Sequence, residues 1–264
     1  MIYYSIMLHN ELEMLKLQFI INCEIVDKFI IIEANKTFSG IKKPYYFLEN
    51  RELFKKYENK IIYIQIKHPD IIEDIELKNL NFQYVPYKNN WIREKNQRES
   101  FLTTFTFDDN DLIFFSDVDE IIFLDKVLPQ IDYGKINYFK LIHCKYYVNT
   151  TDIPIQYVTR ANCCYPYKIY KKYKNVIKTH FNIRKLNYIC DDYIIIDNSG
   201  YHLSLCYDFK EKLQGFSHGE YNVESCLGEL IDGKRSLTKN NVIEIPEIIT
   251  KNVPQRFIYL PTSD

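Results

Sequence analysis

Three carboxylates lie within four positions in the segment Ser116-Asp117-Val118-Asp119-Glu120. Carboxylates so close together repel one another. A divalent cation that prefers oxygen ligands, such as Mn²⁺ or Mg²⁺, relieves that repulsion and can in turn neutralise a diphosphate. The segment therefore predicts a metal site. In the alternative interpretation, Asp117 caps a following helix while Asp119 and Glu120 face solvent.

The elements around this segment predict where it lies. Residues 111–116 form an apolar run typical of a central buried strand, so the carboxylates follow the carboxyl end of that strand. Earlier apolar runs predict strands at residues 3–8, 27–33 and 60–66, and helical spacing predicts helices at residues 11–23, with Asn10 as N-cap, and 91–107. This alternation predicts an α/β fold with a mostly parallel sheet flanked by helices. In such sheets, ligands bind beyond the carboxyl ends of the strands, where the clusters His9-Asn10-Glu11 and Glu33-Ala34-Asn35 are also expected.

The second half of the chain has a looser pattern. Strands are expected at residues 138–148 and 193–197, and helices at residues 210–216 and 225–230. Three prolines after residue 245 predict an extended tail packed on the body. We expect a single domain over residues 1–264, with a nucleotide-sugar-binding half (1–125), an acceptor and catalytic half (126–245) and the tail (246–264).

Composition excludes some functions. The formal net charge is -1, from 34 basic and 35 acidic side chains, so no basic surface is available for nucleic acid. The seven cysteines are an odd number without a regular framework, which favours a reducing compartment. No signal peptide or apolar stretch long enough to cross a bilayer is present, so we expect a soluble cytoplasmic protein.

An ordered series of motifs resembles glycosyltransferase family 17, the family of the β-1,4-mannosyl-glycoprotein 4-β-N-acetylglucosaminyltransferase. The series spans residues 10 to about 233. It comprises Asn10-Glu11-Leu12, Val26-Asp27-Lys28-Phe29, residues 32–40, Lys43-Pro44 with Tyr46-Phe47, Trp91-Ile92-Arg93-Glu94 with Gln97-Arg98, residues 116–120, Gly200-Tyr201-His202-Leu203-Ser204, and Phe216-Ser217-His218 with Glu220. Ala34, Tyr201 and His9 depart from the usual residues of the family. Residues 126–198 match little, which leaves the acceptor open.

The resemblance implies a Rossmann-like GT-A fold and an inverting transferase. The donor would be a metal-bound UDP-sugar, UDP-GlcNAc by resemblance, and the acceptor a hydroxyl of a glycan or glycoconjugate. Asp119 would ligate Mn²⁺ or Mg²⁺, and Asp117 would reach the ribose or a metal-bound water. His202, expected in the turn after the strand at 193–197, would complete the metal ligands, or would be a hydrogen-bonded structural histidine. His218 competes for that role or contacts the diphosphate.

Inversion by direct displacement requires a carboxylate base to take the proton of the acceptor hydroxyl. Glu220 is the first candidate and Asp232 the second, although either could be a solvated helix residue. Arg93 or Arg98 could pair with two phosphate oxygens, while the other pairs with Glu94 or Glu99. The residues assigned to donor binding are Asn10, Glu11, Glu33, Asn35, Arg93, Arg98, Asp117, Glu120 and His218.

Two other functions fit parts of the pattern. A phosphatase or phosphotransferase of the haloacid dehalogenase type also has Asp-x-Asp after an apolar strand, and would use Asp117 as nucleophile. Its strand is usually the first of the domain, whereas three strands precede this one. A non-catalytic sugar-binding relative would need neither base nor metal, but Asp117, Asp119 and Glu120 are all retained.

Overall fold

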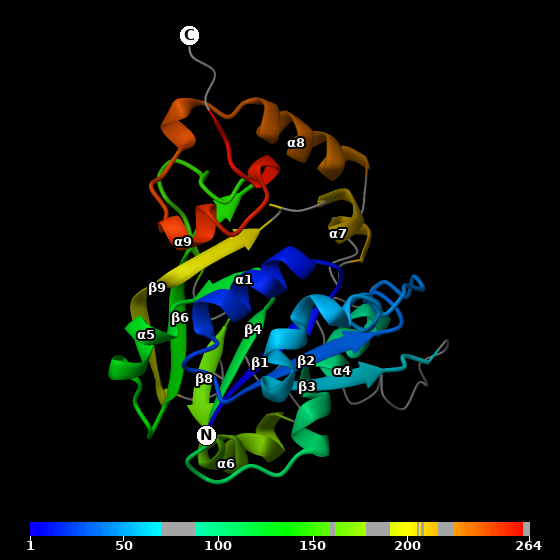
Figure 1. Cartoon of the computed structure of the whole chain (residues 1–264), viewed down its shortest axis with the longest axis vertical. Helices are drawn as coiled ribbons and strands as arrows, with labels where there is room; N and C mark the ends of the chain where they lie inside the picture. Colours follow the sequence, from blue (N-terminus) through cyan, green and yellow to red (C-terminus); the bar gives the residue numbers. More distant parts are fainter. Residues whose placement is uncertain are drawn as a thin grey trace.

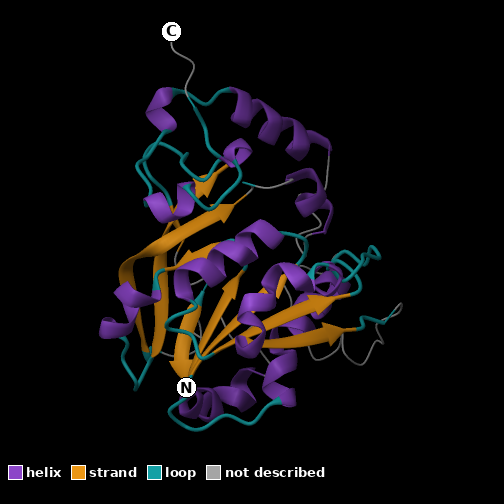
Figure 2. Cartoon of the chain, viewed as in Figure 1, coloured by secondary structure: helices purple, strands orange, loops and turns teal. Residues whose placement is uncertain are grey.

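A twisted β-sheet passes through the whole molecule, with helices on both faces (Figure 2). The computed structural model describes residues 1–69, 88–158, 162–177, 191–204, 206, 209–215 and 224–260. The strands in these residues are β1 (Ile2–Leu8), β2 (Lys28–Ala34), β3 (Ile61–Ile66), β4 (Leu112–Asp117), β5 (Glu120–Ile122), β6 (Ile136–Lys145), β7 (Tyr157–Val158), β8 (Cys163–Pro166) and β9 (Tyr193–Ser204).

The strand order is β3-β2-β1-β4-β8-β6-β9-β5, and β7 pairs with β6. Pairing is parallel from β3 through β4 and again between β6 and β9. It is antiparallel where β5, β7 and β8 join their neighbours, so only these three described strands oppose the common direction. This arrangement confirms the expected Rossmann-like α/β fold with a mostly parallel sheet flanked by helices.

The central strands are buried on both faces because their alternate residues enter two separate cores. In β4, Phe114 packs into the core that contains Leu15 and Phe19 of α1 (Leu12–Asn22). Its neighbour Phe115 packs into the other core, with Phe101 of α4 (Lys88–Thr104). This is why the sequence shows continuous apolar runs rather than polar-apolar alternation. Helix α6 (Tyr167–Ile177) lies with α4 on the second core, near the N-terminus (Figure 1).

Further helices, most of them short, complete the described structure. After β2 come α2 (Tyr46–Glu49) and the 3₁₀ segment η1 (Arg51–Lys60). After β5 come α5 (Leu124–Val127) and η3 (Leu128–Gln130). The C-terminal part contains α7 (Phe209–Gly215), α8 (Glu224–Arg235), η6 (Lys239–Asn241), α9 (Glu247–Thr250) and η7 (Gln255–Phe257). None of the helices in the described ranges has the length and apolar character needed to cross a membrane.

Two local predictions are wrong. The N-cap residue of α1 is Glu11 rather than Asn10, and its side chain makes no capping bond. Strand β9 continues through Ser204, so His202 lies within a strand and not in a turn after it. Strand β9 extends so far because β6 and β5 both pair with this part of it. The segment after residue 245 packs on the body, where the amide of Val148 donates to the carbonyl of Phe257 at 2.9 Å. It is not extended throughout as predicted, because it contains the helical turns α9 and η7.

Gly200 allows β9 to approach β5 closely. Its φ is +149°, and a Cβ at this position would lie 1.9 Å from the carbonyl oxygen of Ile121 in β5. Only glycine fits such an approach. The same pairing then places His202 of β9 opposite Glu120 of β5, which joins the late strand to the acidic segment.

Candidate active site

The acidic segment lies at the carboxyl edge of the parallel strands, as the sequence predicts. Asp117 is in register with Met7 of β1, and Leu8 of β1 is in register with Glu33 of β2. The residues that follow these three strands therefore meet at one edge of the sheet, the usual ligand edge of an open α/β sheet. Figure 1 shows the short helix α7 near the same end of these strands.

The acidic segment does not face solvent. Asp119 and Glu120 are both buried, and the segment leads into strand β5 instead of a helix. The carboxylate of Glu120 accepts the backbone amide of Asp117 at 2.7 Å, which closes the turn between β4 and β5. Gln18 of α1 donates to the carbonyls of Glu120, at 2.8 Å, and Val118, at 3.3 Å. The interpretation as a helix cap with solvated carboxylates is therefore wrong, because this turn is built into the core.

Two basic side chains meet at the carboxylate of Asp119. The Nε2 atom of His202 lies 3.5 Å from Oδ2 of Asp119, and the ammonium of Lys212 donates to the same oxygen. Burial alone would raise the pKa of Asp119, but the charges of Lys212 and His202 outweigh it and hold the pKa well below its usual range. Asp119 is thus a buried anion already paired with the ammonium of Lys212.

Lys212 also faces Glu11, whose Oε1 lies 3.7 Å from its ammonium. Burial lowers the pKa of Lys212, but the charges of Asp119 and Glu11 outweigh that effect and raise it above the usual value. The ammonium is therefore a permanent charge at neutral pH. Helix α7 brings it from 93 residues away in the chain to the acidic segment.

His202 is held between two neighbours. Burial lowers its pKa, but the carboxylate of Asp119 outweighs that effect and raises it. On its other side, the ring of His143 from β6 stacks on it with centroids 5.2 Å apart. Its Nε2 faces Asp119, while its buried Nδ1 has no hydrogen-bond partner in the described structure.

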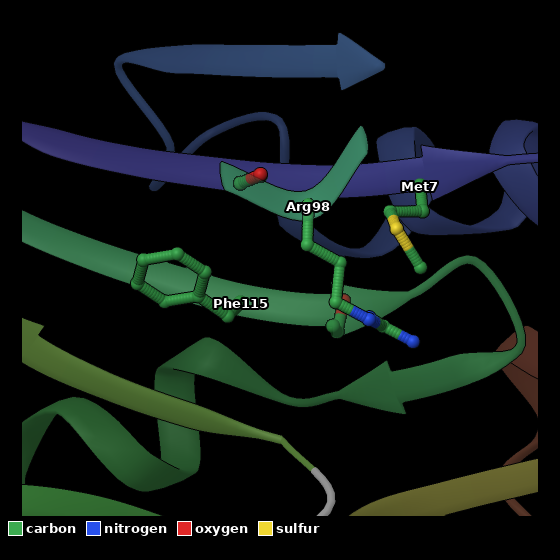
Figure 3. A pocket seen from close by; sticks show the side chains of 5 residues that line it. Met7, Arg98 and Phe115 are labelled. Carbon is green, nitrogen blue, oxygen red and sulfur yellow. The ribbon is translucent and has the colours of Figure 1, made fainter. Parts of the chain in front are cut away.

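Asp117 is oriented by Arg98. The two oxygens of Asp117 accept from Nη1 of Arg98, at 2.7 Å, and Nη2, at 3.2 Å, while Nε of Arg98 donates to Glu94 at 2.8 Å. Burial lowers the pKa of Arg98, but the charges of Asp117 and Glu94 outweigh it and raise the pKa. Figure 3 shows Arg98 between Met7 and Phe115, which line a small pocket with it. Of the two roles expected for the arginines, Arg98 therefore has the one that pairs with Glu94.

Substituting Arg98 with lysine tests the paired hydrogen bonds that its guanidinium makes. A lysine keeps the charge but offers no planar pair of donors, so Asp117 and Glu94 cannot both be held. We expect the free energy of unfolding to fall by about 1–2 kcal/mol, measured by urea denaturation. The matched control is Arg51→Lys, because Arg51 pairs with Glu58 on the surface and its loss should cost at most about 0.5 kcal/mol. An equal loss of unfolding free energy in the two variants would contradict a special role for the Arg98 guanidinium.

The metal ligands expected from the sequence are only partly assembled. No set of three His, Cys, Asp or Glu side chains surrounds a common point in the described parts of the chain. Asp119 and His202 do converge, whereas both oxygens of Asp117 accept from Arg98. The ammonium of Lys212 on Asp119 shows that this position accepts a cation. Asp119 and His202 thus offer one oxygen and one nitrogen ligand of the kinds that Mn²⁺ accepts, and further ligands would have to come from elsewhere.

Comparison with known proteins identifies the family. The model of glycosyltransferase family 17 matches residues 1–229, most of the chain and every strand described above. The chain belongs to glycosyltransferase family 17. It is therefore a glycosyltransferase, and its family membership implies a nucleotide-sugar donor and a glycan acceptor.

Two further comparisons add nothing about function. Comparison with curated proteins gave no match. Among solved structures, the chain is similar to the inositol-1-phosphate CTP transferase from T. maritima, with 10% sequence identity, a TM-score of 0.39, and 89% of this chain and 96% of that chain covered. A similarity this low says nothing about what the family 17 chain binds.

Two residues predicted to bind the donor, Glu33 and Asn35, make their contacts within the protein. Glu33 is fully buried, and its carboxylate accepts from Tyr63, at 2.8 Å, the Phe47 amide, at 3.1 Å, and Lys43, at 3.3 Å. The Oδ1 atom of Asn35 accepts the amide of His68 at 2.9 Å. These contacts favour a role in shaping the loop after β2.

Arg93 does not reach the acidic segment through any described contact. Its Nη1 donates to the carbonyl of Phe38 at 3.0 Å, and its guanidinium lies over Gly40, where a Cβ would lie 3.2 Å from it. Gly40 has φ +95°, a backbone conformation that favours glycine. Arg93 thus holds the loop at residues 38–40, and a diphosphate contact by Arg93 stays a prediction.

Of the two candidate bases, only Asp232 lies within the described residues. Glu220 lies outside them, and so does His218, the expected metal or diphosphate contact. Asp232 lies on α8 with a side chain that is 80% exposed, 3.8 Å from Arg235. A base that works on an acceptor hydroxyl is expected at the reaction centre, so this exposure does not support Asp232.

Asn10 and Glu11, two of the residues assigned to donor binding, do lie at the sheet edge, where the amide of Asn10 donates to Oε2 of Glu11 at 3.2 Å.

Sequence reasoning missed Lys212 and His143. Lys212 is one of many lysines in the chain, and no motif distinguishes it from its neighbours on α7. His143 falls within a predicted strand, and only the parallel pairing of β6 and β9 places it beside His202. The available signal for Lys212 was its position within a short predicted helix after the late histidine, which is too general to select it.

Proposed function

We propose that this chain transfers a sugar, N-acetylglucosamine from UDP-GlcNAc, to a hydroxyl of a glycan or glycoconjugate, with inversion and with a divalent cation. The observation that carries the proposal is the convergence of Asp119, His202 and Lys212 at the ligand edge of the sheet. A diphosphate bound at this edge would need positive charge beside it, and this cluster would supply it.

The roles of individual residues follow from their contacts. Asp119 and His202 would hold Mn²⁺ or Mg²⁺, which when bound supplies positive charge for the departing diphosphate. Arg98 and Glu120 fix the carboxylate and the amide of Asp117, so that the turn presenting Asp119 is rigid before the donor arrives. A preformed turn avoids an ordering cost at the moment of reaction. Glu220 stays our candidate for the base that takes the proton of the acceptor hydroxyl.

The phosphatase alternative fits the structure less well. A nucleophilic aspartate needs an oxygen free to attack phosphorus, whereas both oxygens of Asp117 accept hydrogen bonds from Arg98. The site is also on the fourth strand of the chain rather than the first.

Metal removal tests the proposal. The protein is incubated with UDP-GlcNAc and, in parallel, with other nucleotide-sugars, and released UDP is measured with Mn²⁺ and with EDTA. We expect UDP release with Mn²⁺, fastest with UDP-GlcNAc, and its loss in EDTA. Release that EDTA leaves unchanged would refute the metal requirement. Phosphate release from a simple phosphomonoester, without UDP release, would favour the phosphatase.

A further inference from the structure

The ammonium of Lys212 lies against Asp119, the carboxylate expected to ligate a metal. It contacts Oδ2 of Asp119, and the same oxygen faces Nε2 of His202 at 3.5 Å. Glu11 lies on the other side of the ammonium, at 3.7 Å. The Asp119 oxygen that faces His202, and that would bind a divalent ion with it, is therefore already paired with a cation that belongs to the protein itself.

Because this cluster is buried, its carboxylates need a positive charge close by. The side chains of Asp119 and Glu11 are each 5% exposed, and that of Lys212 is 16% exposed. Two buried carboxylates without a nearby positive charge would strongly destabilise the fold. A lysine and a divalent ion at one oxygen would repel each other, so they exclude one another there. Lys212 and the metal thus compete for Asp119.

The anchoring of α7 limits where the ammonium goes when a metal displaces it. Ser39 holds the C-terminal end of α7, since its hydroxyl donates to the carbonyl of Gln214 at 2.6 Å and its amide to that of Gly215 at 3.4 Å. The helix therefore stays beside the loop that follows β2. A lysine has a flexible four-carbon stem, so its ammonium can leave Asp119 while α7 remains in place. It would then face the anionic part of a donor bound at this edge.

We propose that Lys212 holds the cation position in the metal-free protein and, when metal and donor bind, exchanges Asp119 for a phosphate oxygen of the donor. This inference rests on the proposed function. It makes Lys212 both a competitor of the metal and a contact for the diphosphate. Removing Lys212 should therefore strengthen metal binding and weaken diphosphate binding, and the two affinities are measured separately.

Metal and nucleotide binding to Lys212→Met provide the test, by isothermal titration with Mn²⁺ alone and then with UDP at saturating Mn²⁺. We expect Mn²⁺ to bind about tenfold or more tightly than to the wild type, the change that corresponds to one charge-assisted hydrogen bond. We expect UDP to bind about tenfold more weakly. Mn²⁺ should also raise the midpoint of thermal unfolding more in this variant. Unchanged or weaker Mn²⁺ binding would overturn the competition, and unchanged UDP binding would overturn the phosphate contact.

Three further variants separate charge from shape. Lys212→Arg keeps a cation and should bind Mn²⁺ as the wild type does; tighter binding would overturn the proposal. Lys212→Gln keeps a polar group without charge, and should bind Mn²⁺ more tightly even where the methionine variant folds poorly. Lys140→Met removes a surface lysine that pairs with Asp197 at 3.0 Å, and should change neither affinity. If the wild type binds Mn²⁺ and the methionine and glutamine variants bind it no more tightly, this inference is refuted and the proposed function is not. If neither the wild type nor any variant binds Mn²⁺, the metal dependence of the proposed function is refuted.

Discussion

Replacing Asp119 with asparagine is expected to lower kcat/KM for sugar transfer by about 10³-fold, because the variant loses the anion that would hold the cation against the diphosphate. An amide oxygen keeps the shape of the carboxylate but carries no net charge. Both His202 and Lys212 would then face a neutral group. The measurement is UDP release from UDP-GlcNAc at saturating Mn²⁺, together with the Mn²⁺ affinity of the variant.

The matched control is Asp125→Asn, the same chemical change at an exposed position in the first turn of α5. We expect its activity to stay within about twofold of the wild type, as for most surface substitutions. Circular dichroism on both variants separates loss of chemistry from loss of fold. Full activity of a folded Asp119→Asn enzyme would refute the assignment of Asp119 to the cation.

Replacing Gly200 with alanine is expected to reduce the free energy of unfolding by about 4 kcal/mol or more. The added Cβ would lie 1.9 Å from the carbonyl oxygen of Ile121, and φ at this position is +149°. The obstacle is backbone in a paired strand, so no side chain can rotate away and β5 and β9 must separate. Urea denaturation of purified protein measures the effect.

The control is Gly228→Ala on α8, where nothing lies within 4 Å of the added Cβ. Alanine has the higher helix propensity, so this variant should be more stable by about 0.5–1 kcal/mol or unchanged. Because Gly200 sets the pairing that brings His202 opposite Glu120, partly folded Gly200→Ala protein should also bind Mn²⁺ more weakly. Wild-type stability of Gly200→Ala would show that β9 and β5 do not pair as described.

The early strands and their ligand edge were predictable because they depend on local pattern. Residues 111–116 form an apolar run typical of a strand buried on both faces, and β4 is such a strand. A segment that follows a parallel strand must lie at its carboxyl edge, so the position of Asp117 and Asp119 follows as well. Predictions that depended on one or two residues were weaker: Asn10 is not the N-cap of α1, and His202 lies inside β9.

By itself, the sequence determined the fold class, the family and the place of the acidic segment, since each depends on patterns that persist along the chain. Only the tertiary structure decided the partners of the charged groups. The pairing of Lys212 with Asp119, of Arg98 with Asp117 and of Lys43 with Glu33 depends on where the backbone carries each side chain. Lysines, arginines and carboxylates are common throughout this sequence, so their types do not specify partners. Burial specifies the partners, because a charge removed from water must be paired with an opposite charge within the fold.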